Sequence, residues 1–468
     1  MRVVHNQYHR PLIGRESELR ALQAAYDQAS GQLALVWGRR RIGKSYLLEH
    51  FTRDKPSIFY QATQQAEAVE LEAFTRVVAS ALGADYLPNG YSFPDWETAL
   101  TFIHERNPHP RLVLVLDEFP YLIDTTPALP SILQRWWDKN GRTSPIVLVL
   151  CGSAQTFMES LDGEAAPLHQ RFTRKIHVGP LNYLDAAKFA PNLAPEDCAR
   201  VYAVLGGTPL YLEQWNPNDG FMNNLMRLFG DPTTGLVDSA ELALTSDLPD
   251  GKAPYRLMQA IGLGKTRFSE IRDYARVTSE RALQRLIALQ LIERRTPATE
   301  APERTKRSIY AIKDPYFRFF FRFISRNRGE IDRGFGERVL ESQVLPYFDD
   351  YMGFVFEDIA RQYVRRLASL DTHGWEADRI GQWWSADGQH EIDVVGTRNI
   401  KEVAVAGTVK WRKEPLDRSV LNHLNADLAA LGAGDDVPRL LIGRGGMAKS
   451  LHGTPRTSGV SIADIYTP

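Results

Sequence analysis

Short apolar runs alternate with longer helical patterns over the first half of the chain. The runs are rich in leucine and β-branched residues and span residues 33–37, 57–61, 111–116, 145–151 and 175–178. Continuous apolar strands separated by helices are typical of a parallel sheet that is covered on both faces. The pattern therefore predicts an α/β domain, which we place at residues 1–235.

The pattern changes in the second half. Within residues 250–325, three short helical periodicities are followed by a charged two-strand segment and an aromatic, basic helix. Three helices and a β-ribbon are typical of a winged helix. We assign the winged helix and its linker helix to residues 236–330. Residues 331–468 return to helix, hairpin, helix and strand, which predicts a small α/β domain.

Charge and cysteine content narrow the class of protein. A formal net charge of -1 argues against a uniformly basic nucleic-acid binder, so any such surface must be a local patch. Cys151 and Cys198 form no disulfide framework, which indicates a reducing compartment. The apolar runs are far shorter than the ~20 residues that span a bilayer. The first residues also lack the apolar core of a signal peptide. We therefore expect a soluble, cytoplasmic protein with no membrane partner.

The clearest chemical signal is the stretch GRRRIGKS, which follows an apolar run and opens a helical pattern. It fits the phosphate-loop spacing G-x-x-x-x-G-K-[ST], in which backbone amides face the phosphates of a nucleotide. Lys44 would reach the β- and γ-phosphates, and Ser45 would bind Mg²⁺. The alternative is a plain glycine turn before a helix. The predicted ATP-binding residues of this loop are Gly38, Arg39, Arg40, Arg41, Ile42, Gly43, Lys44 and Ser45.

The stretch LVLVLDEF, residues 112–119, supplies the expected partner of this loop. Asp117 ends an apolar strand, where it is placed to hold the Mg²⁺ shell, and Glu118 is placed to orient or deprotonate the attacking water. The next apolar run leads to Ser153, a polar group positioned to sense the γ-phosphate. The alternative is two solvated acids at a strand end. The sequence thus predicts Lys44 and Glu118 as catalytic residues, with ATP and Mg²⁺ as cofactors.

Four further stretches support a family resemblance: LIGRESEL (12–19), CGSAQTFME (151–159), PLHQRFTRKIHVGPL (167–181) and GGTPLYL (206–212). Together with the two motifs above, they resemble the archaeal-type AAA+-like ATPases. The winged helix and the tail resemble the C-terminal part of that family, whose last domain is similar to a PD-(D/E)xK nuclease. The resemblance implies a P-loop NTPase sheet with a helical lid, a winged helix and a nuclease-like α/β domain. It also implies Mg²⁺-dependent ATP hydrolysis and a homo-oligomer.

The same resemblance suggests two more residues of the ATP site. Arg171 matches an arginine of the family and is a candidate arginine finger, supplied in cis or by a neighbouring subunit. The alternative is an ordinary surface arginine beside Arg174 and Lys175. Pro209 in GGTPLYL is expected near the base or ribose, and its alternative is a plain turn that begins a helix.

The third helix of the winged helix carries a candidate DNA surface. Leu283, Leu286 and Ile287 share one face, which leaves Arg281 and Arg285 on the other. A recognition helix with a basic wing would use such residues on the major groove and on phosphates. The alternative is a solvated charged face. The predicted DNA-binding residues are Ser279, Arg281, Arg285, Arg304, Lys306 and Arg307.

The hairpin HEIDVVGTRNIKEVAVAGTVKW, residues 390–411, resembles the metal-binding hairpin of a nuclease. Such a site needs acids to hold Mg²⁺ and a lysine beside the attacking water. Glu357 resembles the first acid, Asp393 the second and Lys410 the lysine. Thr408 stands where a third acid is expected, and a neutral hydroxyl lowers the charge that attracts a metal. We therefore expect a nuclease-like fold with impaired or absent cleavage.

Three hypotheses remain open from the sequence. The chain is a DNA-associated ATPase, a nucleotide-dependent oligomeric switch that binds a protein partner, or an ATP-regulated nuclease. The same phosphate loop serves all three.

Overall fold

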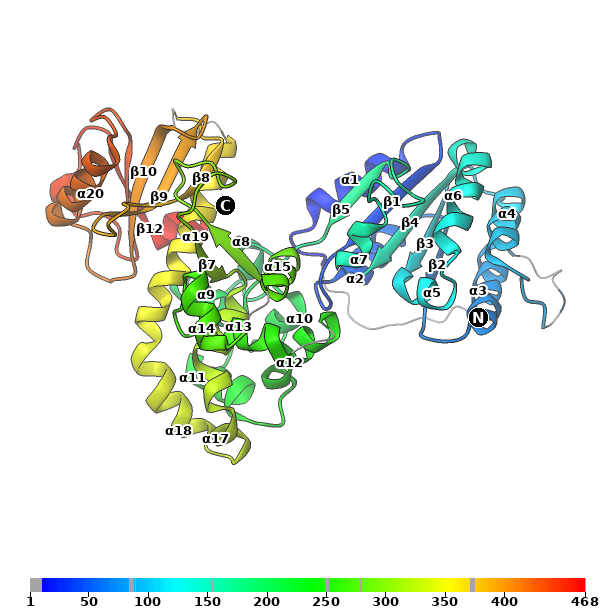
Figure 1. Cartoon of the computed structure of the whole chain (residues 1–468), viewed down its shortest axis with the longest axis horizontal. Coiled ribbons are helices and arrows are strands. Elements are labelled where there is room, and N and C mark those ends of the chain that lie inside the picture. Colours follow the sequence, from blue (N-terminus) through cyan, green and yellow to red (C-terminus); the bar gives the residue numbers. More distant parts are fainter. Residues whose placement is uncertain are drawn as a thin grey trace. The chain divides into compact units, whose positions relative to one another are not determined.

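The computed structural model describes residues 11–467 apart from residues 84–87, 89, 154, 249–251, 278–279 and 371–374. The chain divides into two compact units, Met1–Pro180 and Leu181–Pro468 (Figure 1). Each unit contains its own hydrophobic core clusters.

A five-stranded parallel sheet forms the centre of the first unit, with the strand order β2-β3-β4-β1-β5. Every residue of β3 and of β4 is buried, as continuous apolar runs predict for the inner strands of a covered sheet. The predicted α/β fold with a parallel sheet is confirmed. The strands are β1 (Gln32–Trp37), β2 (Ser57–Gln61), β3 (Leu112–Asp117), β4 (Ile146–Gly152) and β5 (Arg174–His177).

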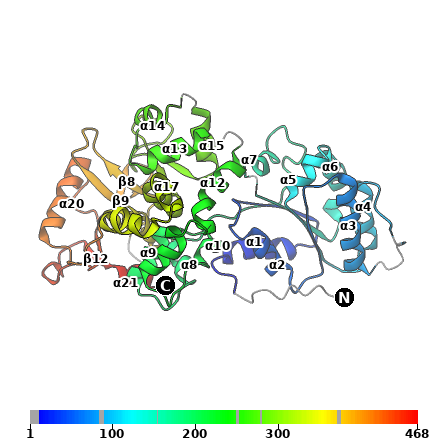
Figure 2. The same cartoon turned by 90° about the horizontal axis from the view of Figure 1, so that it is seen from below.

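Helices cover both faces of this sheet (Figure 2). Leu33 and Leu35 of β1 pack in the core that includes α3, α4 and α6, whereas Ala34 and Val36 pack with α1 and α2. This alternation follows from the two-residue period of a strand. The helices of the unit are α1 (Glu16–Tyr26), α2 (Lys44–Thr52), α3 (Glu67–Leu82), α4 (Trp96–Arg106), α5 (Phe119–Thr125), α6 (Leu129–Lys139), η1 (Gly141–Thr143) and α7 (Gln155–Ser160).

The second unit begins with helices and continues into three helices and a ribbon in the predicted order. Strands β6 (Ile292–Arg295) and β7 (Ile309–Ile312) pair antiparallel. The preceding helices are α8 (Tyr183–Ala187), α9 (Pro195–Leu205), α10 (Pro209–Leu212), α11 (Phe221–Leu225), η2 (Met226–Gly230), α12 (Gly235–Asp247), α13 (Lys252–Gly262), α14 (Phe268–Ala275) and α15 (Glu280–Ala288). Those that follow are α16 (Pro315–Phe319), η3 (Phe320–Ile324), η4 (Ser325–Asn327), α17 (Arg328–Asp332), α18 (Gly336–Val339), η5 (Leu340–Val344), η6 (Leu345–Tyr347) and α19 (Phe348–Leu370).

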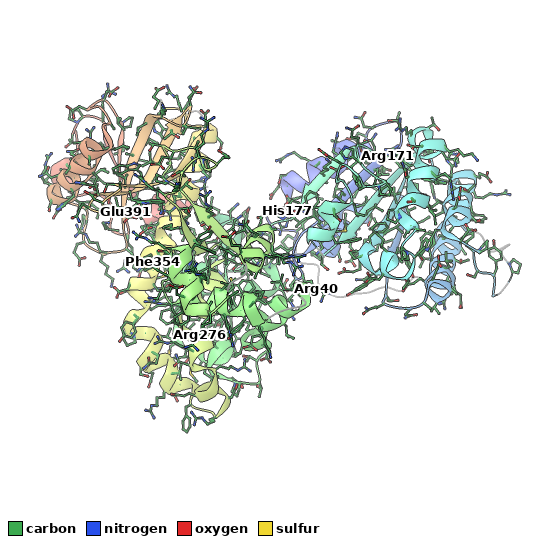
Figure 3. All side chains as sticks on the ribbon, viewed as in Figure 1. Arg40, Arg171, His177, Arg276, Phe354 and Glu391 are labelled. Atoms are coloured by element: carbon green, nitrogen blue, oxygen red, sulfur yellow. The ribbon has the colours of Figure 1, made fainter. Side chains whose placement is uncertain are left out.

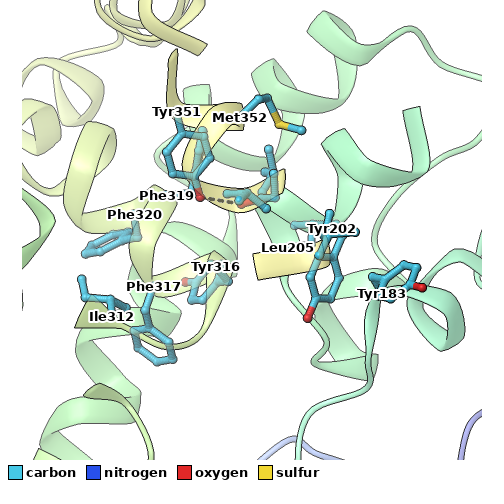
Figure 4. Close-up of a cluster of buried hydrophobic side chains, with 14 of the residues drawn as sticks. Tyr183, Tyr202, Leu205, Ile312, Tyr316, Phe317, Phe319, Phe320, Tyr351 and Met352 are labelled. Carbon is cyan, nitrogen blue, oxygen red and sulfur yellow. Dashed lines mark hydrogen bonds between the residues drawn. The ribbon is translucent and has the colours of Figure 1, made fainter. Parts of the chain in front are cut away.

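Residues 181–235, which the sequence pattern groups with the first domain, pack in the core of the second unit. Aromatic side chains make the connection: the Tyr351 hydroxyl of α19 donates a hydrogen bond to the carbonyl oxygen of Ala203 at 2.7 Å (Figure 4). The carbonyl oxygen of Pro315 lies 3.1 Å from the same hydroxyl. Tyr202, Tyr316 and Tyr351 are all buried there. The compact units divide at residue 180, and the domain boundary at residue 235 stays a prediction.

A second five-stranded sheet ends the chain, with the order β12-β11-β10-β9-β8. Strands β8, β9 and β10 pair antiparallel, whereas β10, β11 and β12 pair parallel. Val394 and Val405 pack on the side of α19, and Val395 and Ala406 pack on the side of α20. The elements are β8 (Arg379–Trp384), β9 (Glu391–Arg398), β10 (Glu402–Lys410), α20 (Arg418–Leu431), β11 (Arg439–Gly443), η7 (Lys449–Leu451), β12 (Thr457–Ser461) and α21 (Ile462–Tyr466).

Candidate functional site

The phosphate loop lies where the sequence predicts it, between β1 and α2. Gly43 is the N-cap residue just before α2, and it adopts a left-handed conformation with a φ of 91°. A Cβ atom on Gly38 would lie 2.1 Å from the carbonyl oxygen of Val178, so only glycine fits there. Both glycines of the motif are thus required by the backbone path.

The lysine of the phosphate loop is buried within the loop. Lys44 is 6% exposed, and its Nζ donates hydrogen bonds at 3.0 Å to the carbonyl oxygens of Gly38 and Arg39. Arg15, from the LIGRESEL stretch, donates to the carbonyl oxygen of Ile42 at 3.0 Å and supports the loop from behind. If Lys44 binds phosphate as predicted, its Nζ exchanges these carbonyl oxygens for phosphate oxygens.

Two side-chain pairs bring the acids of β3 to this loop. The Ser45 hydroxyl donates to Asp117 Oδ2 at 2.6 Å, and Asp117 is fully buried. The Ser153 hydroxyl, which follows β4, donates to Glu118 Oε2 at 3.0 Å. The backbone supports the pairing, because Glu118 has a φ of 50° and its N–H donates to Asp117 Oδ1 at 3.0 Å. A hydroxyl and a carboxylate are ligands that suit Mg²⁺, so Ser45 and Asp117 form a fitting pair for that ion.

Sequence reasoning missed two neighbours of these acids. Burial, and after it the Asp117 carboxylate, raise the pKa of the Cys151 thiol well above its ordinary value, so Cys151 stays neutral. The Tyr121 hydroxyl accepts a hydrogen bond from Arg40 at 3.1 Å. The tyrosine stands within the LVLDEFPYL stretch, but only the fold shows that it meets the phosphate loop.

Arg171 lies at the end of the sheet where the strands begin, opposite the end that carries the phosphate loop. Its Nε and Nη2 bond the Asp138 carboxylate, at 3.0 Å to Oδ1 and 2.7 Å to Oδ2, and its Nη1 bonds two carbonyl oxygens. Thr173 bonds the carbonyl oxygen of Leu33 at the start of β1, whereas the phosphate loop follows the end of that strand. Four residues of strand separate these levels by roughly 13 Å. Figure 3 shows Arg171 and Arg40 at opposite ends of the sheet.

Pro209 begins α10 in the second unit, within a turn that Gly207 makes tight. A Cβ atom on Gly207 would lie 2.0 Å from the carbonyl oxygen of Leu181. This contact explains the glycine by packing inside the second unit. The position of Pro209 near a nucleotide base stays a prediction.

The candidate DNA-binding residues have different surroundings. Arg281 is exposed and Arg285 is half-buried on α15, opposite the buried Leu283 and Leu286. Ser279 lies outside the described residues. Arg304 and Lys306 are exposed, whereas Arg307 pairs with Glu300 at 3.2 Å and with the carbonyl oxygen of Trp384.

The wing between β6 and β7 docks on strand β8. The Ala298 N–H donates to the carbonyl oxygen of Gln382 at 2.8 Å, and Ala298 is buried in the C-terminal core. Arg379 of β8 donates to the carbonyl oxygen of Glu300 at 2.7 Å and to the Thr296 hydroxyl at 2.8 Å. The wing thus covers an edge strand of the second sheet, which the sequence pattern does not predict.

A buried ionic cluster joins the ribbon to α19. Asp358 of α19 pairs with Arg295 of β6 at 2.8 Å, with Arg318 of α16 at 2.6 Å and with Arg361 of its own helix. Burial opposes the charge of Asp358, but the three arginines outweigh it and hold the pKa of Asp358 well below its ordinary range. We call these four residues the Asp358 cluster.

The nuclease-like hairpin brings its predicted residues together. Asp393 Oδ2 accepts hydrogen bonds from the Thr408 hydroxyl at 3.1 Å, the Val409 N–H at 2.7 Å and Lys410 Nζ at 3.4 Å. Burial, and after it the Asp393 carboxylate, raise the pKa of Glu357 to about 7. Glu391 is exposed at the start of β9 (Figure 3). Among the described residues, no three His, Cys, Asp or Glu side chains form a group that can hold a metal ion.

Comparison with known proteins agrees with the phosphate loop. Residues 12–215 match a family described as an ATPase domain predominantly from Archaea. Residues 320–423 match a family described as archaeal and bacterial proteins of unknown function. The uncharacterized protein MJECL04 of Methanocaldococcus jannaschii is 26% identical over 412 residues, which cover 87% of this chain and 89% of that protein.

Solved structures with similar folds include two archaeal proteins. The Walker-type ATPase PABY2304 of Pyrococcus abyssi has a TM-score of 0.48 at 18% identity, over 67% of this chain and 99% of that one. The ORC2 protein of Aeropyrum pernix has a TM-score of 0.42 at 13% identity, over 72% of this chain and 98% of that one.

The fold and the loop define an ATP-binding P-loop ATPase. Residues 12–215 are similar to the archaeal-type ATPase domain, and residues 320–423 are similar to the second family. In the part of the chain that the structure describes, no helix has the length and apolar character needed to cross a membrane.

Proposed function

We propose that the chain hydrolyses ATP with Mg²⁺ and couples hydrolysis to DNA held by the second unit. The observation that supports hydrolysis is the pair of contacts at the ends of β3 and β4: Ser45 to Asp117 at 2.6 Å and Ser153 to Glu118 at 3.0 Å. They bring the phosphate loop, a metal-binding carboxylate and a water-orienting carboxylate to one edge of the sheet.

Each residue has one task in this mechanism. Lys44 binds the β- and γ-phosphate oxygens, and the loop amides neutralise the rest of the charge. Ser45 and Asp117 would hold Mg²⁺, which would supply charge neutralisation at the phosphates. Glu118 orients the attacking water, and Ser153 fixes the Glu118 carboxylate. The water oxygen bonds to the γ-phosphorus, and the bond to the β–γ bridging oxygen breaks with its electron pair left on ADP. The proton that the water loses passes to Glu118.

DNA association is supported by the outward face of α15 and the exposed end of the wing. Arg281, Arg285, Arg304 and Lys306 form this proposed surface, and Arg307 is already paired within the chain. A role of Arg171 in hydrolysis requires a neighbouring subunit, because the arginine lies at the far edge of its own sheet.

Two other functions remain candidates. The docked wing favours a nucleotide-dependent switch with a protein partner, since a wing held on β8 is less available to DNA. An ATP-regulated nuclease is the weaker candidate, because Asp393 Oδ2 is occupied by three donors of its own hairpin.

The test is ATP hydrolysis by the full chain, with and without duplex DNA at low salt, where phosphate contacts are strongest. Lys44→Ala serves as the blank. Stimulation by DNA supports the coupled ATPase. A rate of hydrolysis that DNA does not change would exclude the coupled ATPase and favour the switch. Absence of hydrolysis would reject the proposed chemistry.

A further inference from the structure

The phosphate loop carries an arginine that the hydrolysis mechanism above does not use. Arg40 is exposed, and its Nη2 donates to the Tyr121 hydroxyl at 3.1 Å. Tyr121 lies in the first turn of α5, where its N–H donates to the Glu118 carbonyl oxygen at 2.9 Å. The guanidinium therefore contacts the hydroxyl of a residue that stands three positions after Glu118.

Two arginines outside the loop are held elsewhere, whereas Arg39 and Arg41 flank Arg40 within the loop. Arg171 is held by Asp138 at the beginning of the strands. Arg15 donates to the carbonyl oxygen of Ile42 and to Glu18, behind the loop. Hydrolysis builds negative charge on the γ-phosphoryl oxygens, and a guanidinium aimed at that charge is a strong means of lowering the barrier.

We propose that Arg40 is a catalytic arginine supplied in cis, which contacts the γ-phosphoryl oxygens during ATP hydrolysis, and that Tyr121 is its positioning residue. The hydrogen bond to Tyr121 uses one of the five N–H donors of the guanidinium, so the others remain for phosphate oxygens. Arg40 exchanges no proton in the step. This inference rests on the proposed hydrolysis at the same site.

The test compares Arg40→Gln, Arg40→Lys and Tyr121→Phe with the full chain. We expect Arg40→Gln to lower kcat by about 100-fold or more while the KM for ATP changes by less than about threefold. Arg40→Lys should recover part of the rate, because it restores the charge but not the fork. Tyr121→Phe should lower kcat by a smaller factor. Arg53→Gln, at an exposed position after α2, is the matched control and should hydrolyse ATP normally.

A second measurement separates transition-state contact from loop stability. ADP with aluminium fluoride mimics the planar phosphoryl group, and Arg40→Gln should bind this mixture much more weakly than the original chain while binding ADP equally well. An unchanged kcat, or a raised KM with unchanged kcat, would overturn the proposal. So would a parallel loss of ADP affinity and thermal midpoint. If the original chain hydrolyses no ATP, the function proposed for the site fails first.

Discussion

The contacts of the Asp393 carboxylate depend on the residue at position 408. In a working nuclease site the residue at position 408 would be an acid and would share a metal with Asp393. Here Thr408 donates a hydrogen bond to Asp393 Oδ2 at 3.1 Å, and the Val409 N–H donates at 2.7 Å. A carboxylate that accepts these bonds holds the two strands of the hairpin together.

Replacing the hydroxyl should therefore create metal affinity. We expect Thr408→Glu to bind Mg²⁺ or Mn²⁺ about 10-fold more tightly than the original chain, because a carboxylate ligand replaces a neutral donor. We also expect it to gain cation-dependent cutting of duplex DNA. Titration calorimetry and a plasmid-nicking assay measure the two effects. Adding Asp393→Ala should remove both, and cutting by the original chain would contradict the prediction.

Glu357 should make the stability of the folded chain depend on pH. Burial and Asp393 raise the pKa of Glu357 from an ordinary 4.5 to about 7 in the folded chain. Between these values the folded state holds a proton that the unfolded state has released, so this group contributes stability that is present below pH 4.5 and lost as the pH rises through 7. The contribution is on the order of 3 kcal/mol.

The measurement is the thermal midpoint of the full chain at several values of pH. Glu357→Gln keeps the neutral, hydrogen-bonding form, so the variant should gain stability relative to the original chain as the pH rises from 4.5 to 7. A constant difference between the two chains over that range would disprove the assignment.

At the scale of elements, the wing and α19 act as one connected structure. The wing docks on β8 through Ala298 and Arg379, and the Asp358 cluster joins β6, α16 and α19. Arg361 of the cluster also donates to the Asp393 carbonyl oxygen at 2.8 Å. The ribbon of the winged helix is therefore linked to the nuclease-like hairpin through buried charge.

Removing the central charge should destabilise this connection strongly. Asp358→Asn leaves Arg295, Arg318 and Arg361 without their shared carboxylate, and breaking a buried ion pair costs about 3–5 kcal/mol. The thermal transition of the second unit should fall accordingly. Asp435→Asn, at an exposed carboxylate, should leave it unchanged. Equal stability of the two variants would show that the cluster carries little energy.

At the scale of the whole molecule, the proposed DNA coupling requires a local basic surface, since the net charge of the chain is only -1. We expect Arg281→Ala/Arg285→Ala/Lys306→Ala to lose DNA-stimulated hydrolysis and keep basal hydrolysis. If all three contact phosphates, the slope of log affinity against log salt should fall by about 3. Arg20→Ala/Arg53→Ala/Arg106→Ala removes equal charge from exposed positions of the first unit. Equal loss in both variants would indicate nonspecific attraction.

The sequence by itself determined the features that local spacing encodes. The apolar runs predicted the parallel strands, and GRRRIGKS with LVLVLDEF predicted a loop and an acid that meet in the fold, because each motif joins a strand end to its loop. The three helices and the ribbon also followed from local periodicity. These features depend on neighbours along the chain.

Only the tertiary structure decided which distant residues meet. It carried residues 181–235 into the second unit, where Tyr202 and Tyr351 bury their rings in one core. It placed Arg171 at the far edge of the sheet and Arg40 beside Tyr121, and it closed the wing onto β8. The physical reason is that burial and ion pairing across long chain separations leave no periodic signal, since they depend on how whole elements pack.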